Sequence, residues 1–510
     1  MAAEDHIADK GRPFTGAEYL ASLNDGREVY IDGERIANVA NHPAYRNSAR
    51  SIARLYDALH APETKDVLTC PTDTGSDGYT HRFFRAARSS ADLFAQRDAI
   101  AAWARLSYGW MGRTADYKAA LTNTLGANAA WYGDYADNAR AWHRRTQESV
   151  LFMNHAIVNP PIDRNKPASE VKDVYVSIDE ETDAGIVVSG AKVVATASAL
   201  THYNFLSQTS PAVMEDPSLA VVFMMAMNSP GVKMFSRVSY ERAAGLNGSP
   251  FDYPLSSRFD ENDAILVLDR VLIPWENVLL KGDGKKIMAF QGRSGFMQGY
   301  CFQGCTRLAV KLDFLAGLLA KALKATGGDE FRGNQAMLGE VISYRNLMWT
   351  LTDAMAGAPV SWVGEAVLPS MQAAMSYRAL APEIYPRIKD IIEKTVASGL
   401  IYLPSSVKDF QNPDIDPYLR QYVRGSGDMD YKERIKIMKL LWDSIGTEFG
   451  GRHELYERNY AGALEDIRLQ ALMIAQRGGA MNQMQALVDR CMADYDENGW
   501  TGEDWLDPSA

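Results

Sequence analysis

The sequence predicts a multidomain α+β protein in which a mainly helical part, a β part and a second helical part follow one another along the chain. With 510 residues, the chain is too long for one ordinary domain. Apolar residues recur at helical spacing before residue 150 and after about residue 285, and short β-branched runs with polar turns lie between. We therefore expect an N-terminal helical domain at 1–150, a central β domain at 151–280 and a C-terminal helical domain at 281–510.

The first part is predicted to be mainly helical. Residues 15–23 are a short candidate helix, and residues 47–59 place their apolar side chains at near-helical spacing. A long pattern rich in Ala, Leu and Ile covers 90–108. Ser90 is the expected N-cap of that helix, because a serine side chain accepts a hydrogen bond from a free amide of the first turn.

The middle part is predicted to be a compact antiparallel sheet, sandwich or barrel. Residues 174–178 alternate between apolar and polar, as a half-buried strand does. Residues 185–195 contain two β-branched runs with Ser189-Gly190 between them, which predicts a hairpin. Residues 219–227 and 264–272 are further strand candidates.

The last part is predicted to be a helical bundle. A strongly apolar helix at 307–325 is expected to stop at Gly327-Gly328, because glycine is favoured just beyond a helix end. Further helical patterns follow with short connections, at 339–355, 385–396, 432–445 and 464–476.

The composition excludes several classes of protein. Apolar residues make up 46% and charged residues 23% of the chain, as in a folded globular protein. A net charge of −11 argues against binding to nucleic acid or to an anionic membrane. Four cysteines without a paired framework suit a reducing cytoplasm. The first ten residues lack the apolar run of a signal peptide, and the apolar stretch 314–323 is too short to cross a bilayer.

Several familiar catalytic motifs are absent from the sequence. No Gly-x-Gly-x-x-Gly follows a predicted strand, and no Walker, His-Glu-x-x-His, Cys-x-x-Cys or Gly-x-Ser-x-Gly motif occurs. The eight histidines do not cluster at metal-ligand spacing. Cys301 and Cys305 could form half of a metal site, but two small core residues are the favoured interpretation because no second pair completes four ligands. We expect no metal.

Three segments carry polar residues where apolar ones would pack better. In 109–117, Arg113 and Tyr117 are four apart, so a helix would present them together to an oxyanion or phenolate; the alternative is a surface arginine packed on a ring. In 154–164, His155 lies at the junction between helices and strands, as a ligand-site residue or as a buried structural histidine. In 446–460, Gly450-Gly451 and Arg452 suit either a planar or phosphorylated ligand or a helix–helix turn.

Taken together, long stretches of the chain resemble a single family. They occur in order at 13–20, 47–59, 108–113, 155–163, 190–196, 249–263 and 449–457. Their sequences are similar to those of the oxygenase components of two-component, reduced-flavin-dependent phenol hydroxylases. The resemblance implies an acyl-CoA-dehydrogenase-like fold and a homotetramer packed through the C-terminal helices. It also implies a separate NAD(P)H:flavin reductase that supplies reduced FAD, which would explain the missing dinucleotide motif.

The resemblance implies an ortho-hydroxylation that converts a para-substituted phenol, such as 4-hydroxyphenylacetate, to a catechol. Arg113, Tyr117 and His155 are the implied active-site residues, and all three are implied to bind substrate. A loop at 207–214 is implied to grip the substrate, with Thr209 and Ser210 as contacts to an acidic tail. The implied flavin contacts are His155, Ala156, Ile157, Pro161, Ile162, Asp163, Arg164, Thr196, Thr447, Phe449, Gly450, Gly451 and Arg452.

The resemblance implies that reduced FAD reacts with O₂ to give a C4a-hydroperoxide, whose electrophilic terminal oxygen is attacked by the ring carbon beside the phenolic oxygen. A phenolate is the better nucleophile, but a phenol with a pKa of about 10 is neutral at pH 7. The three implied side chains are expected to favour negative charge on that oxygen, with His155 as the proton acceptor. The loop at 207–214 is a candidate lid that keeps water out.

Three alternatives remain open. 4-hydroxybutyryl-CoA dehydratase resembles this family but holds an iron–sulfur cluster through three cysteines and a histidine, and this chain has only Cys70 in the helical region before the β part. An acyl-CoA dehydrogenase would hold oxidised FAD and use a carboxylate base. A helical scaffold would bind no flavin, so anaerobic titration with reduced FAD would separate it from the oxygenase.

Overall fold

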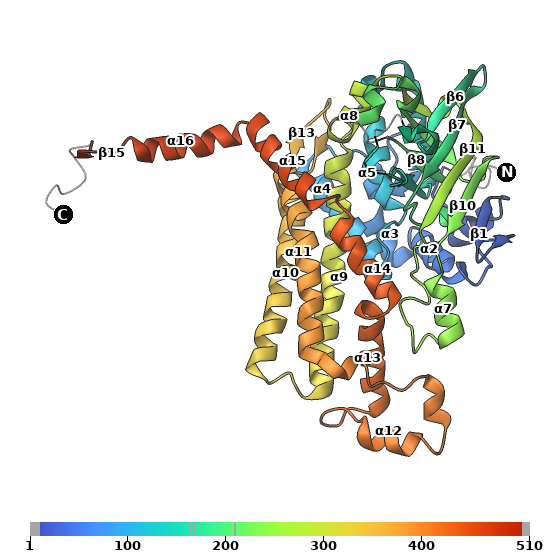
Figure 1. Ribbon diagram of the computed structural model, residues 1–510, viewed down its shortest axis with the longest axis vertical. Coiled ribbons are helices and arrows are strands. Elements are labelled where there is room, and N and C mark those ends of the chain that lie inside the picture. The colour runs from blue at the N-terminus through green and yellow to red at the C-terminus, as the bar shows by residue number, and fades with distance from the viewer. Residues whose placement is uncertain (1–10, 164, 167–169, 209–210, 502–510) are drawn as a thin grey trace.

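A computed structural model of the chain describes residues 11–163, 165–166, 170–208 and 211–501. In Figure 1 the C-terminal helices stand beside the strands of the central part, with the first helices between them. The expected order of helices, then strands, then helices is confirmed. The domain boundaries themselves stay a prediction.

The N-terminal part is mainly helical, as predicted. Its longest helix is α4, whose N-cap is Ser89 rather than Ser90, because the Ser89 hydroxyl accepts the hydrogen bond from the Asp92 amide. The helices are α1 (Gly16–Ser22), α2 (Arg46–Ala58), α3 (Pro62–Leu68), α4 (Ser90–Leu106), α5 (Asp116–Leu125) and α6 (Ala136–Ser149). This part also supplies β1 (Glu28–Ile31), β2 (Glu34–Ile36), β3 (Thr69–Pro71) and β4 (Tyr79–His81).

Two sheets form the central part. The larger has the strand order β2-β1-β10-β11-β7-β6, so two of its six strands come from the N-terminal part. The smaller has the order β12-β9-β8-β5. Most pairs are antiparallel, but β1 with β10 and β5 with β8 are parallel. The strands are β5 (Met153–Ala156), β6 (Ser177–Thr182), β7 (Gly185–Lys192), β8 (Tyr203–Leu206), β9 (Val221–Ala226), β10 (Val232–Ser236), β11 (Ala264–Pro274) and β12 (Val278–Lys281), with α7 (Tyr240–Asn247) between β10 and β11.

The predicted hairpin at 185–195 is wrong. Ser189 and Gly190 lie inside one strand, β7, which pairs with β11 on one side and β6 on the other. Gly190 is there for close approach rather than for a turn, because a Cβ atom would lie 2.3 Å from the Tyr175 carbonyl oxygen. The strand predicted at 174–178 begins later, at Ser177, since Lys172–Val174 form a short 3-10 turn.

The C-terminal part is a bundle built around one long helix, α9. Every side chain of α9 from residue 296 to 312 is buried, because α4, α5, α10, α11 and α13 pack around it. Cys301 and Cys305 both lie in this buried half as free thiols. The helices are α8 (Gly284–Arg293), α9 (Phe296–Thr326), α10 (Arg332–Gly357), α11 (Met371–Val396), α12 (Asp416–Tyr422), α13 (Tyr431–Ile445), α14 (Glu448–Asn459), α15 (Leu464–Arg477) and α16 (Ala480–Met492).

The end of the chain departs from this compact body. In Figure 1, α16 extends away from the bundle toward the short pair β15 (Tyr495–Asp496) and β16 (Gly499–Trp500). A second short pair, β13 (Val360–Ser361) and β14 (Val367–Leu368), joins α10 to α11. Among the described residues, no helix is long and apolar enough to cross a membrane.

Candidate active site

A cavity of about 940 Å³ lies where the β part meets the helices. The end of β5 and the segment after it form one wall, and residues of α8, α9 and α14 form the others. The turn that follows α14 and the first residues of α15 complete the rim. Arg113, Tyr117 and His155, the three residues expected to carry the chemistry, all line this cavity.

Arg113 lies in a cage of aromatic rings just before α5. Its guanidinium carbon is 4.0 Å from the centre of the Tyr117 ring and 5.3 Å from that of Tyr460. The side chain is buried, its Nε has no hydrogen-bond partner, and no carboxylate of the described residues forms an ion pair with it. A buried guanidinium without a carboxylate is suited to bind an anionic oxygen that enters the cavity.

The backbone that carries Arg113 is fixed by a buried carboxylate. Glu261 accepts hydrogen bonds from the Gly112 amide (2.9 Å) and from the Arg113 amide (2.6 Å). Asn154, at the end of β5, donates to the carbonyl oxygens of Arg113 and Thr196. These contacts join the segment before α5 to the central β part, and so fix the backbone from which the guanidinium extends.

His155 is the third side chain of the group, and it comes from β5. Its Nε2 is 3.3 Å from Nη1 of Arg113, and its ring centre is 5.5 Å from that of Tyr117. Burial lowers the pKa of His155 well below its usual value, and the positive charge of Arg113 acts in the same direction. The structure thus brings together Arg113, Tyr117 and His155, and it keeps the imidazole neutral at pH 7.

Lys118 was not predicted as a site residue, yet its Nζ is 3.0 Å from Nδ1 of His155. Nothing in the sequence pattern distinguishes this lysine. All ten residues of α5 are buried, so the helix has no polar face to contrast with an apolar one. A lysine next to a predicted site tyrosine then looks like an ordinary surface residue.

A second charged network borders the cavity on the side of α14. Asp263 receives hydrogen bonds from Thr196 Oγ1 (2.6 Å) and from Nη2 of Arg452 (2.8 Å). Burial opposes its ionisation, but Arg452 and Arg237 hold the pKa of Asp263 well below its usual range. Nη1 of Arg452 and Oη of Tyr456 are buried without hydrogen-bond partners among the described residues.

Some of the predicted flavin contacts line the cavity and others do not. His155, Ile157, Thr196 and Arg452 line the cavity, and Ala156 is buried in β5 beside them. The start of α14 does not line it: Thr447 is the N-cap of that helix, with Phe449, Gly450 and Gly451 in its first turn. Pro161, Ile162 and Asp163 follow β5 on the surface, and Arg164 lies outside the described residues.

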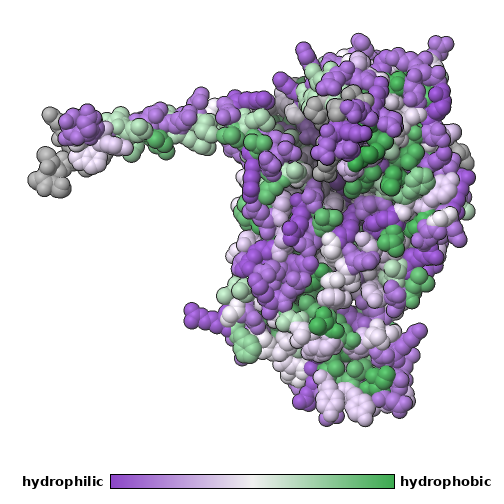
Figure 2. Space-filling view, in the orientation of Figure 1, coloured by the Kyte–Doolittle hydropathy of each residue, from purple (hydrophilic) through white to green (hydrophobic). Residues whose placement is uncertain are grey.

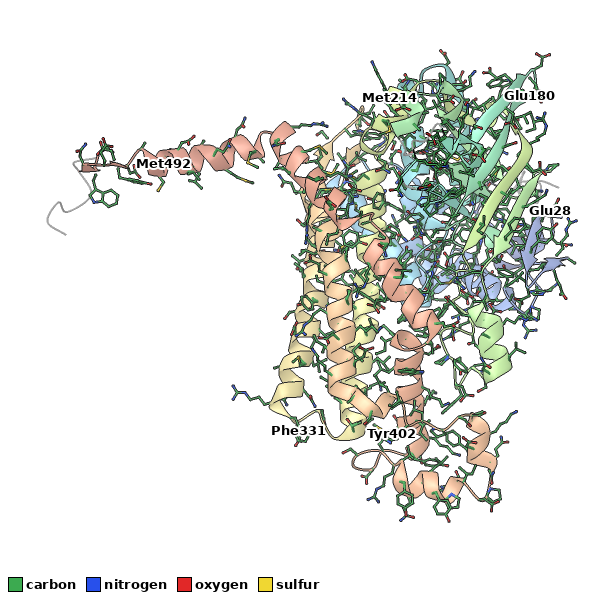
Figure 3. All side chains as sticks on the ribbon, in the orientation of Figure 1. Glu28, Glu180, Met214, Phe331, Tyr402 and Met492 are labelled. Carbon is green, nitrogen blue, oxygen red and sulfur yellow. The ribbon has the colours of Figure 1, made fainter. Side chains whose placement is uncertain are left out.

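The predicted substrate loop is described only in part. Ser207 and Gln208 line the cavity, whereas Thr209 and Ser210 lie outside the described residues. The base of the loop is held by Lys192, whose Nζ donates to the Ser207 carbonyl oxygen and to Oε1 of Gln208, both at 3.0 Å. The turn Pro211–Met214 packs against α8, and Met214 at its end is exposed (Figure 3).

The cavity has the size and the polar lining of a ligand site. Its volume is at the upper end of the range of roughly 300–1,000 Å³ found for ligand pockets. Three buried polar atoms on its lining residues have no hydrogen-bond partner in the described part of the chain, namely Nε of Arg113, Nη1 of Arg452 and Oη of Tyr456. Among the described residues, no group of three or more His, Cys, Asp or Glu side chains is arranged to hold a metal ion.

Comparisons with known proteins give one consistent result. Residues 15–280 match the family model described as 4-hydroxyphenylacetate 3-hydroxylase N terminal, and residues 288–489 match its C-terminal counterpart. The chain is 61% identical over 502 residues to the 4-hydroxyphenylacetate 3-monooxygenase oxygenase component of Pseudomonas aeruginosa, covering 98% of this chain and 96% of that protein. It is 54% identical over 495 residues to the 4-nitrophenol 2-monooxygenase oxygenase component of a Rhodococcus species, covering 97% and 95%.

A solved structure agrees with these sequence matches. It is the oxygenase component of 4-hydroxyphenylacetate 3-monooxygenase complexed with FAD and 4-hydroxyphenylacetate. The two chains superpose with a TM-score of 0.88 at 29% identity, covering 94% of this chain and 99% of that one.

Proposed function

The chain belongs to the 4-hydroxyphenylacetate 3-hydroxylase family, and on that premise we propose that it is the oxygenase component of a two-component monooxygenase. It uses reduced FAD and O₂ to hydroxylate a para-substituted phenol, such as 4-hydroxyphenylacetate, at the ortho carbon and so makes a catechol. The observation that carries this proposal is the caged guanidinium of Arg113, which lies beside Tyr117 and His155 in a cavity large enough for flavin and phenol.

The proposed role of Arg113, Tyr117 and His155 is to bind the phenolic oxygen and favour its negative charge. Arg113 can donate to that oxygen because its guanidinium has no carboxylate partner among the described residues. Phe296 and the ring of Tyr300 give the cavity apolar surface against which an aromatic ring can lie. Such fixed donors in a buried site favour charge that develops during the reaction.

Reduced FAD, when bound, supplies the activation of O₂. We propose that Thr196, Arg452 and the segment from His155 to Ile157 hold it, because all of these residues except the buried Ala156 line the cavity. Pro161, Ile162, Asp163 and Arg164 on the neighbouring segment are proposed as further contacts, as are Thr447, Phe449, Gly450 and Gly451 at the start of α14. Thr209 and Ser210 remain the proposed contacts to the acidic tail of the substrate.

A separate NAD(P)H:flavin reductase supplies the reduced flavin, as the name of an oxygenase component implies. We further infer a homotetramer in which C-terminal helices of neighbouring copies pack together. None of the α16 residues is buried in the single chain, and the projecting arm carries green apolar patches (Figure 2). Exposed apolar side chains of this kind mark a surface that a second chain can cover. On α15 and α16 they are Leu469, Leu472, Met473, Met484, Leu487, Val488 and Met492.

Light scattering on the purified protein should give four chains per particle, and a monomer would contradict the tetramer.

A cytoplasmic location is proposed because all four cysteines are free, as a reducing compartment would keep them.

A panel of para-substituted phenols tests the proposed function. The purified chain, a flavin reductase, NADH and FAD are incubated with each phenol, and the aromatic product is identified. Catechol should form only when the reductase and the chain are both present. If the product is absent for every phenol, the proposed function is wrong.

A further inference from the structure

We propose that Lys118 rests as a neutral amine and that it receives, through the His155 ring, the proton that a bound phenol loses. This inference rests on the proposed function, since it assigns the final position of the phenolic proton. The observation behind it is that both nitrogen atoms of His155 face side chains that are ordinarily cationic donors.

One assignment of protons satisfies both contacts of His155. In this assignment Nε2 accepts from Nη1 of Arg113, 3.3 Å away, because a guanidinium can only donate, and Nδ1 carries the ring proton. Nζ of Lys118 is 3.0 Å from Nδ1, so it has to accept that proton's hydrogen bond. An ammonium group has three donors and no acceptor, whereas a neutral amine has a lone pair.

The surroundings of Lys118 also favour the neutral amine. Only 1% of the residue is exposed, and no carboxylate of the described residues is paired with it. Burial and then the positive charge of Arg113 lower the pKa of Lys118 well below its usual value.

The groups that face Lys118 come from α5 and the segment before it, and from β5, β8 and α9. The segment before α5 presents the Arg113 guanidinium, α5 itself the Tyr117 phenol, and β5 the His155 imidazole. From α9 and β8 come uncharged rings, with Nζ 4.1 Å from the centre of Phe296 and 5.0 Å from that of Phe205. The face of Phe296 attracts a cation, so an ammonium that forms here has a stabilising neighbour.

The proton transfer balances within this group of side chains. The phenolic O–H bond breaks and an N–H bond forms at Nε2 of His155. The N–H bond at Nδ1 breaks, and Nζ of Lys118 becomes an ammonium. The ring is neutral before and after, while the phenolate is left beside the Arg113 guanidinium. His155 thus passes the proton from the phenol to Lys118 and is neutral again afterwards. Its lowered pKa therefore does not prevent the phenol from losing its proton.

Proton uptake on binding tests this assignment without relying on turnover. The chain is loaded with reduced FAD without O₂ in a weakly buffered solution, at a pH above the pKa of free 4-nitrophenol, so the probe enters as a phenolate. A pH indicator then counts protons per probe bound. A neutral Lys118 should take up about one proton per 4-nitrophenolate. The number of protons taken up on binding equals the change in the number of protons that the binding groups carry.

Two variants and a control make the result specific. Lys118→Met removes the amine, and Lys118→Arg keeps a permanent positive charge, so both should bind the probe with almost no uptake. Lys321→Met, on an exposed site of α9, should behave as the wild type. The proposal is overturned if the wild type takes up no proton, because Lys118 would then already be charged. Uptake that persists in Lys118→Met would also overturn it by placing the proton on His155.

The same titration separates the inference from the proposed function. If the wild type binds no 4-nitrophenolate and makes catechol from no phenol of the panel, both the function and the inference fail. If the wild type binds the probe and makes catechol in air but takes up no proton, the function stands and the role of Lys118 is wrong.

Discussion

The guanidinium of Arg113 stacks on the ring of Tyr117, with 4.0 Å between the guanidinium carbon and the ring centre. The sequence predicted that the two side chains would meet because residues four apart share a helix face. They do meet, but α5 begins only at Asp116, so Arg113 lies in the segment before the helix. Glu261, which accepts from the Arg113 amide, fixes that segment in place of the helix.

Replacing Arg113 by lysine should slow hydroxylation. Lysine keeps the charge but loses the planar fork that stacks on Tyr117 and donates toward the phenolic oxygen. Loss of one such donor costs about 10²–10³-fold in kcat. The measurement is steady-state catechol formation with reductase-supplied flavin, with Arg332→Lys on the exposed start of α10 as the matched control. Equal rates for Arg113→Lys and the control would exclude a role for the fork.

Replacing His155 by alanine should uncouple O₂ consumption from hydroxylation. The imidazole is the group placed to take the phenolic proton, a role that contributes about 10²–10⁴-fold in rate. Flavin binding has other proposed contacts, so O₂ should still be reduced, and it should appear as H₂O₂. The readout is catechol relative to H₂O₂ per reduced FAD. His42→Ala, which does not line the cavity, is the control, and an unchanged ratio in His155→Ala would make the histidine structural.

The buried ion cluster of the bundle should make stability depend on pH in the acid range. Glu457 binds Arg307 through both carboxylate oxygens and Lys311 at 3.0 Å. Burial opposes ionisation, but Arg307 and then Lys311 lower the pKa of Glu457 to about 2. Because the folded-state pKa lies below the unfolded value, this stabilisation is present above the unfolded pKa and is lost as the pH falls toward about 2.

Glu457→Gln tests that cluster directly. Removing one member of a buried ion pair costs about 3–5 kcal/mol, because Arg307 and Lys311 are left without their anion. Urea unfolding at pH 7 should show this loss, and the variant should lose less further stability between pH 5 and 2 than the wild type does. Parallel pH profiles for the two proteins would show that Glu457 does not titrate in this range.

The purified chain should contain no stoichiometric metal despite Cys301 and Cys305. Both thiols are buried, and Sγ of Cys305 is 3.4 Å from the Met348 carbonyl oxygen, a core contact. Burial raises the pKa of Cys301 to about 12, which disfavours the thiolate that metals bind. Elemental analysis that found one iron or zinc per chain would overturn this expectation.

The sequence predicted the order of helices and strands and several residues that line the cavity. It did not predict features that depend on contacts between distant parts of the chain. The helical patterns at 90–108 and 432–445 were recovered within a few residues, since local spacing determines them. The place of β1 and β2 in the large sheet was missed, because β1 pairs with β10, about 200 residues later in the chain. The mistaken turn at Gly190 has the same origin, since only the fold brings Tyr175 against that glycine.

Within the site, sequence motifs identified the residues but not their electrostatics. His155 was expected to accept the proton because a free histidine has a pKa near 6.5. In the structure Arg113 contacts Nε2 of the ring and Lys118 contacts Nδ1, so the acceptor that we propose is His155 together with Lys118. Neither neighbour's position relative to the ring could be read from spacing, since Lys118 belongs to α5 and His155 to β5.

The most direct test of the central claim is a single turnover with isotopically labelled oxygen. The purified chain is mixed without O₂ with chemically reduced FAD and 4-hydroxyphenylacetate, in the absence of NADH and of any reductase, and is then exposed to ¹⁸O₂. The account predicts a catechol whose new hydroxyl oxygen is ¹⁸O, with no product when oxidised FAD replaces reduced FAD. A product that carries oxygen from water, or oxidation of NADH by the chain alone, would contradict it.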